Sequence, residues 1–205
     1  MAIYNNGVNG AFSGKLGSVV GATWKGKPYM RSMPSKYTGP VSEGVIAGRK
    51  KFATAHLWLK PLLPFVRVGF KGYSPTAEGF VAAKSHLLKN SFESNGDNLV
   101  INPALVKVSH GDLPLPANIT AVKLASGKVQ FSWDITDVNK DNRFDQAMLL
   151  AYDVEKGVAY YQAPGQPRMN GGDELTIGTG TFHLYVAFVA GDRSRQSDSV
   201  YLGTI

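Results

Sequence analysis

Two hydrophobic patterns divide the chain. Up to about residue 95, apolar positions recur at helical spacing or lie in short runs between glycines. From residue 98 onward they alternate with a period of two, in short segments separated by turn residues. The second pattern is typical of seven short antiparallel strands packed as a β-sandwich. We therefore predict two domains, a basic N-terminal docking domain over residues 1–95 and a β-sandwich domain over residues 96–205.

A β-hairpin is predicted near the N-terminus. Residues 19–24, "VVGATW", and 28–33, "PYMRSM", flank the turn sequence "KGK". Gly26 can supply the positive φ of a tight turn, and Pro28 falls at a strand start, where proline is tolerated. Before the hairpin, residues 5–18 are rich in Gly, Asn and Ser and predict an extended arm with short strand segments.

Two helices are predicted to follow the hairpin. Ser42 is placed to cap the first, which runs to about Lys60 with Glu43 in its first turn. Its expected buried stripe comprises Val45, Ile46, Phe52, Ala53, Leu57 and Leu59. Ser74 and Pro75 predict the start of the second helix, which ends near Asn90. This helix is expected to bury Phe80, Val81, Leu87 and Leu88.

The sandwich is expected to begin with strands over residues 99–102 and 104–111, followed by a strand pair around Ser126 and Gly127. Trp133 and Tyr185 fall where immunoglobulin-like or fibronectin-type sandwiches place core aromatics, which is an analogy of fold. The predicted fold class is α+β: an N-terminal β-hairpin plus helices, followed by an all-β immunoglobulin/fibronectin-like sandwich.

Charge separates the same two halves. The net charge of the chain is +7. Residues 1–95 carry 13 Lys/Arg against 3 Glu, which is +10, and residues 96–205 carry 9 Lys/Arg against 12 Asp/Glu, which is −3. The basic half could face either nucleic acid or an acidic protein surface.

Catalytic and cofactor motifs are absent. The chain has no Cys, its four His show no ligand spacing, and no G-x-S-x-G, P-loop or dinucleotide fingerprint occurs. We therefore expect a protein that is not an enzyme and that has neither a cofactor nor a metal site. Calcium binding remains an alternative for one loop. Its residues Asp137, Asn139, Asp141 and Asp145 follow part of a calcium-loop pattern. Asn142 and Met148 replace the Gly and Glu of that pattern, and ordinary Asx turns are the alternative.

Cations and aromatics together make the candidate partner-binding surface, for protein or nucleic acid. Cations can neutralise phosphates or carboxylates, and exposed aromatic rings can stack on bases or anchor a protein interface. The candidate residues are Lys15, Trp24, Lys25, Lys27, Tyr29, Arg31, Lys36, Arg49, Lys50 and Lys51.

The N-terminal segment also carries a motif. Gly14, Lys15, Gly17, Val20, Gly21, Trp24, Lys25, Gly26 and Arg31 match G-K-x-G-x-x-V-G-x-x-W-K-G-x-x-x-x-R. With "FSW" at 131–133 and "SVYLG" at 199–203, the chain resembles an uncharacterised family of bacterial and phage-encoded proteins, a domain of unknown function. More distantly, the arm, basic helix and aromatics are similar to small proteins encoded among phage structural genes. This resemblance implies a virion component and brings no catalytic residue with it.

Our first hypothesis is therefore a non-enzymatic structural or assembly protein, with other subunits of a homo- or hetero-oligomer as partners. A nucleic-acid-binding accessory protein and a surface or carbohydrate-binding sandwich module are the alternatives. The chain shows no classical signal peptide and no 18-residue apolar run, so we expect a virion or cytoplasmic location and no membrane insertion.

Overall fold

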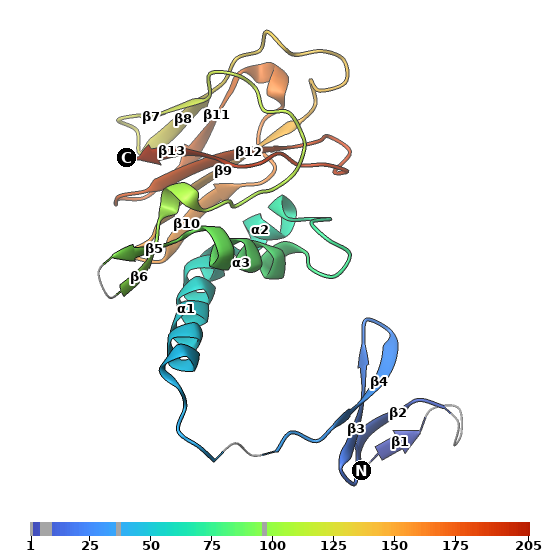
Figure 1. Ribbon diagram of the computed structural model, residues 1–205. Coiled ribbons are helices and arrows are strands. Elements are labelled where there is room, and N and C mark those ends of the chain that lie inside the picture. Colours follow the sequence, from blue (N-terminus) through green and yellow to red (C-terminus); the bar gives the residue numbers. More distant parts are fainter. Residues whose placement is uncertain (1, 5–9, 36–37, 96–97) are drawn as a thin grey trace. The chain divides into compact units, whose positions relative to one another are not determined.

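Contacts within the chain form two separate groups. The computed structural model describes residues 2–4, 10–35, 38–95 and 98–205 (Figure 1). The contacts within the chain divide it into two compact units, Met1–Ser42 and Glu43–Ile205. The boundary between the units therefore differs from the one predicted after residue 95.

The N-terminal unit is an antiparallel sheet with strand order β1-β2-β3-β4. Its strands are β1 (Ala2–Tyr4), β2 (Phe12–Leu16), β3 (Val19–Trp24) and β4 (Lys27–Ser32). Lys25 and Gly26 join β3 to β4 with φ of 46° and 78°, the two positive values that a type I′ turn requires. The predicted hairpin is confirmed. Residues 5–9 of the predicted arm lie outside the described residues, and the rest of the arm contains β2.

Helices open the second unit (Figure 1). They are α1 (Glu43–Leu59), η1 (Lys60–Leu62), α2 (Leu63–Gly69) and α3 (Gly79–Asn90), followed by the hairpin of β5 (Phe92–Asn95) and β6 (Asn98–Ile101) and by η2 (Pro103–Leu105). In α1 the buried residues, Ala55, Trp58 and Leu59, all lie in its C-terminal half.

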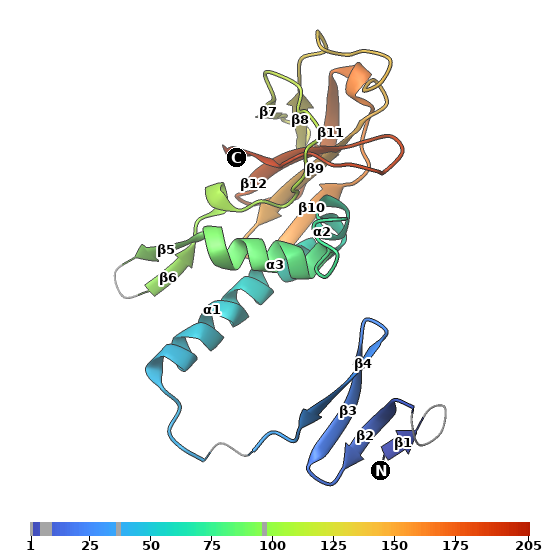
Figure 2. The ribbon, with the colours of Figure 1, turned by 45° about the vertical axis from the view of Figure 1, so that its right-hand side comes forward.

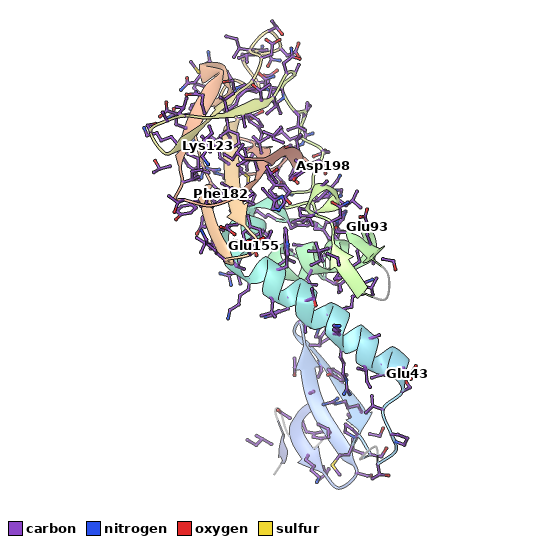
Figure 3. The ribbon with its side chains drawn as sticks, turned by 90° about the vertical axis from the view of Figure 1, so that its left-hand side faces the viewer. Glu43, Glu93, Lys123, Glu155, Phe182 and Asp198 are labelled. Carbon is purple, nitrogen blue, oxygen red and sulfur yellow. The ribbon has the colours of Figure 1, made fainter. Side chains whose placement is uncertain are left out.

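The predicted stripe of α1 is therefore wrong over most of its length. Val45, Ile46, Phe52 and Leu57 are exposed, and Ala53 is exposed as well. Figure 2 shows the reason: the N-terminal half of α1 extends away from α2, α3 and the sheets, and Figure 3 shows Glu43 at this far end. Helical periodicity is present, but among the described residues the buried positions of α1 are confined to its C-terminal half.

The start of the second predicted helix also differs. The Ser74 hydroxyl accepts a hydrogen bond from the N–H of Ala77 at 2.9 Å, which closes a local turn, and α3 begins only at Gly79. Leu87 is buried as predicted, whereas Val81 is exposed because it faces away from α1 and α2.

Two antiparallel sheets complete the second unit. One has the strand order β10-β9-β12-β13 and the other β11-β8-β7. The strands are β7 (Thr120–Lys123), β8 (Lys128–Ser132), β9 (Gln146–Asp153), β10 (Val158–Gln162), β11 (Gly172–Thr176), β12 (His183–Val189) and β13 (Val200–Thr204); η3 (Arg168–Asn170) precedes β11. The α+β class is confirmed, and β7 and β8 form the strand pair predicted around Ser126 and Gly127.

The sheet centred on β9 and β12 is covered on both faces. In β9, Leu149 packs into a core shared with β8 and β11, and the next residue, Leu150, packs into a core shared with the helices. Leu184 and Tyr185 of β12 divide in the same way. This arrangement explains why both strands are almost continuously apolar, since no position along them faces water.

The helices therefore share a core with the β9–β12 sheet, and the two compact units divide after Ser42. Trp58 of α1 packs edge-on against Tyr152 of β9, with ring centroids 5.0 Å apart. The Tyr152 hydroxyl donates to the carbonyl of Trp58 at 2.9 Å, and burial raises the pKa of this tyrosine to about 12. Separating the chain after residue 95 would expose one whole face of the β9–β12 pair.

Residues 104–111 do not form the predicted strand. Their N-terminal part is η2, and the segment beyond it runs extended without joining a ladder, its backbone bound partly by side chains such as that of Ser199. The two predicted core aromatics are both buried. Trp133 donates from Nε1 to the carbonyl of Arg168 at 2.8 Å, and Tyr185 donates to that of Pro103 at 2.7 Å.

Candidate functional site

Strand register brings five of the candidate residues onto one face of the N-terminal sheet. Val20 lies opposite both Lys15 of β2 and Arg31 of β4, so these three residues share a face. Ala22 pairs with Tyr29 and Trp24 pairs with Lys27, two and four residues beyond Val20 in the same alternation. We call this face, with Lys15, Trp24, Lys27, Tyr29 and Arg31, the basic face.

The side chains of the basic face are presented to solvent. Trp24 is 57% exposed and Tyr29 is 45% exposed, and with Lys27 they line a shallow hollow of about 400 Å³. Lys25, in the turn, places its Nζ 5.7 Å from the centroid of the Trp24 ring. Aromatic side chains in this state can stack on a partner without first leaving a core.

No carboxylate side chain in this unit can neutralise these cations. Residues 1–42 contain five Lys/Arg and no Asp or Glu. The positive potential of the basic face is therefore directed outward, and an acidic partner would meet it without displacing an internal ion pair.

The opposite face of the same sheet is apolar. Phe12, Leu16, Val19 and Met30 share it with Gly21, over which Phe12 lies: a Cβ on Gly21 would come within 2.7 Å of the Phe12 ring. Leu16 is 49% exposed and Met30 is 70% exposed. Among the described residues of this unit, Gly21 alone is buried, so the sheet has no interior of its own.

Three further candidate cations lie on α1. Arg49 and Lys50 are exposed on α1, and Lys51 is half-buried with its Nζ 4.8 Å from the centroid of the Phe92 ring. They belong to the second unit. Lys36 lies outside the described residues.

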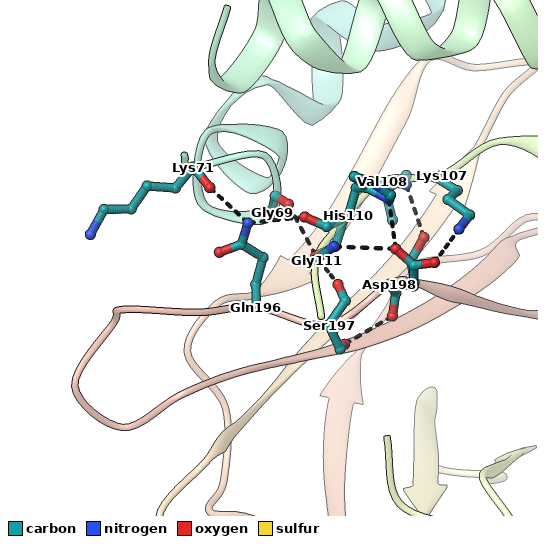
Figure 4. Close-up of polar contacts among 11 residues, drawn as sticks. Gly69, Lys71, Lys107, Val108, His110, Gly111, Gln196, Ser197 and Asp198 are labelled. Carbon is teal, nitrogen blue, oxygen red and sulfur yellow. Dashed lines mark hydrogen bonds and ion pairs between the residues drawn. The ribbon is translucent and has the colours of Figure 1, made fainter. Parts of the chain in front are cut away.

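A polar cluster that the sequence did not predict joins three segments of the second unit (Figure 4). Asp198, before β13, forms an ion pair with Lys107, and its Oδ1 lies 2.7 Å from Nδ1 of His110. The Gln196 side chain donates to the carbonyls of Lys71 at 2.7 Å and His110 at 2.9 Å. These partners lie 86 to 125 residues apart in the chain, so no local motif could have indicated them.

The contacts of this His110–Asp198 cluster hold three chain segments together, which is a structural role. Burial of Asp198 opposes its ionisation, but the hydrogen bonds from Lys107 and from the Gly111 N–H outweigh it and lower its pKa. The neighbouring hydroxyl of Ser109 donates to the carbonyl of Ser197 at 2.7 Å, and that of Ser199 accepts from the Val108 N–H. Both hydroxyls are therefore bonded to the backbone of a neighbouring segment.

The contacts of the predicted calcium loop follow the Asx-turn alternative. The Asn139 side chain accepts from the N–H groups of Asp141 at 2.8 Å and Asn142 at 3.2 Å. Asp145 turns inward to Arg168, with 3.6 Å between Oδ2 and Nη1. Within the described ranges, no group of three His, Asp or Glu side chains is arranged to hold a metal ion. Nor is any described helix both long and apolar enough to cross a membrane.

Comparison with known proteins gives one result. The model of a family of unknown function, DUF6266, matches residues 11–203. The expectation of an uncharacterised family is confirmed at this level. No curated protein and no solved structure matches the chain.

Proposed function

The chain belongs to DUF6266, a family of unknown function, and on that premise we propose that it is a non-enzymatic assembly protein. Its N-terminal sheet docks onto a partner protein, and the second unit is presented by that attachment. The observation that carries the proposal is the sheet without an interior, apolar on one face and basic on the other.

A protein partner accounts for both faces. A small sheet is stable in water only when at least one face is packed against another layer. The described residues of the N-terminal unit do not supply that layer, as the exposure of Leu16 and Met30 indicates. Nucleic acid could neutralise the cations of the basic face, but it would leave the apolar face in contact with water. A protein surface can cover it.

The basic face supplies the residue types that dominate protein interfaces. Trp, Tyr and Arg are the side chains enriched among residues that cost most on truncation, and Trp24, Tyr29 and Arg31 lie together here. Because the unit has no acidic side chain, the surface that it meets is expected to be acidic. Arg49 and Lys50 of α1 offer further cations to the same partner.

The test separates docking from folding. Residues 43–205 and the full chain would be expressed with the same tag in the native host, and assemblies would be isolated by sedimentation. We expect the full chain to sediment with a defined partner, and residues 43–205 to stay in the supernatant with unchanged circular dichroism. Trp24→Ala with Arg31→Ala should reduce co-sedimentation, and Lys123→Ala, on the second unit, should not. Equal co-sedimentation of the shortened chain would exclude the proposed docking role.

Nucleic-acid binding is the second candidate, favoured by cations and exposed aromatic rings on one face. It predicts affinity for a labelled single-stranded oligonucleotide that falls steeply with salt, with a smaller salt slope in Lys27→Ala and Arg31→Ala. A salt slope equal to that of the wild type in both variants would remove this candidate.

Two finer proposals concern context and fold. We infer a phage particle as the assembly, on the resemblance to proteins encoded among phage structural genes; capsid, portal or tail genes beside the coding sequence would support it. We also infer an immunoglobulin/fibronectin-like sandwich. Among β7 to β13, the first, second and fifth strands form one sheet and the third, sixth and seventh the other. The fourth strand pairs with the third, which differs from the constant-type arrangement.

A further inference from the structure

A hollow of about 920 Å³ opens at one end of the sandwich. Three loops and the segment before β7 surround it. The loops are the β8–β9 loop, the β10–β11 loop with η3, and the β12–β13 loop, which lie toward the upper right of Figure 1, and the segment before β7 contributes Leu113 and Pro114. Its volume falls within the range of small-molecule sites, and it lies wholly in the second unit.

Buried polar atoms form the floor of this hollow. Arg168 is 2% exposed and Asp145 is 3% exposed, and both line the hollow. Within the described residues, Oδ2 of Asp145 and Nε of Arg168 have no hydrogen-bond partner. The two atoms belong to the buried ion pair between these side chains, and they lie beneath the surface of the hollow.

Three guanidinium groups beside the hollow already have acceptors in the chain. Arg168 pairs with Asp145, and its Nη1 also donates to the carbonyl of Pro114 at 2.8 Å. Arg195 pairs with Asp112 at 3.0 Å, and Arg193 donates to the side chain of Gln146. An anionic ligand would therefore find no guanidinium without an acceptor among these three residues.

The rim combines amide, carboxylate and aromatic groups. Asn139, Asp141 and Asp192 contribute polar side chains. Phe144 is 56% exposed, and the guanidinium of Arg143 lies 4.6 Å from the centroid of its ring. An exposed ring at the edge of a polar hollow offers a flat apolar surface beside hydrogen-bonding groups.

We propose that this hollow binds a neutral oligosaccharide. Such a ligand has no net charge, both donates and accepts hydrogen bonds through its hydroxyls, and presents apolar C–H faces to an aromatic ring. The sugar hydroxyls bond to Asp141 and Asp192 on the rim, and a ring of the sugar packs on Phe144. The proposal goes beyond the docking function and does not depend on it.

Calorimetry with the full chain tests this site. The probes are cellotriose, chitotriose, xylotriose and maltotriose, titrated singly. We expect at least one to bind with a Kd on the order of 1 mM or tighter. Phe144→Ala should weaken that binding roughly tenfold, and Asp192→Asn should weaken it by a similar factor. Both residues are exposed, so the fold of each variant should persist, as circular dichroism will verify.

The matched control is Lys123→Ala, beside the separate hollow lined by Leu124 and Thr179. This variant should bind the sugar with the wild-type Kd. Absence of binding for all four trisaccharides would overturn the proposal, and so would a wild-type Kd in both Phe144→Ala and Asp192→Asn. Either result would leave the docking proposal untouched, because that proposal is read from co-sedimentation.

Discussion

Substitution of Leu150 by Ala should weaken the whole second unit, because β9 is the layer that both cores share. Leu150 is fully buried on the helix-facing side. Truncation of a buried leucine to alanine costs about 2–5 kcal/mol of unfolding free energy. For a chain of this size, that corresponds to a fall in Tm of roughly 4–20 °C.

Two tryptophans allow the effect to be read on each side of β9. Trp58 reports on the helix-facing core and Trp133 on the core between the sheets. The background Trp24→Phe/Trp133→Phe keeps only the first, and Trp24→Phe/Trp58→Phe keeps only the second. In each background, Leu150→Ala should lower the free energy of unfolding, measured by denaturant titration, by the same amount. The exposed-site control, Val122→Ala, should change that free energy by less than about 0.5 kcal/mol.

A shift confined to the Trp58 signal would refute this reasoning. It would mean that the sheets unfold without the helices, and that the domain boundary predicted after residue 95 describes cooperativity better than the contacts do. Coincident transitions from both probes are what a single cooperative unit requires.

Three other outcomes are expected. Removal of residues 1–42 should leave the Tm of residues 43–205 unchanged by circular dichroism, because contacts divide after Ser42; a large fall would contradict the two-unit division. Gly21→Ala should speed amide hydrogen exchange in β2 and β3 without altering exchange in β9, because the new methyl group meets the Phe12 ring; unchanged exchange would argue against that packing. The folded-state pKa of Asp198 is depressed, so its contribution is present above its ordinary pKa of 3.8 and is lost as pH falls through the folded value. Asp198→Asn should therefore lower the denaturant midpoint at about pH 7 and have little effect near pH 2; an equal effect at both would contradict an ionic role.

Periodicity predicted the helices and strands well where the hydrophobic spacing and the turn residues that define an element lie within one segment. The Lys25–Gly26 turn, the strand pair of β7 and β8 and the approximate positions of α1 and α3 all follow from local spacing and turn residues. The start of the second helix was predicted wrongly at Ser74. A local turn and a helix N-cap both use a hydrogen bond from a backbone N–H to a serine hydroxyl, here from Ala77 to Ser74.

Packing between distant segments could not be predicted in the same way. The stripe on α1 is present in the sequence, but whether Val45 or Leu59 is covered depends on where the sheets lie. The basic face was foreseen as a set of residue types, and the register then placed five of them together. Asp198 and Lys107 are 91 residues apart, and the unpaired atoms of Asp145 and Arg168 depend on the burial of both side chains.

The double coverage of β9 and β12 has a consequence for the unfolded chain. Residues 147–151, "AMLLA", and 184–190, "LYVAFVA", are apolar, without charge and without proline. Segments of this kind have the composition of cross-β zippers, and only the folded state keeps them apart from other chains. Asp145, Asp153 and Asp192 lie beside the two segments and act as charged gatekeepers, so heating this protein at high concentration should lead to aggregation that cooling does not reverse.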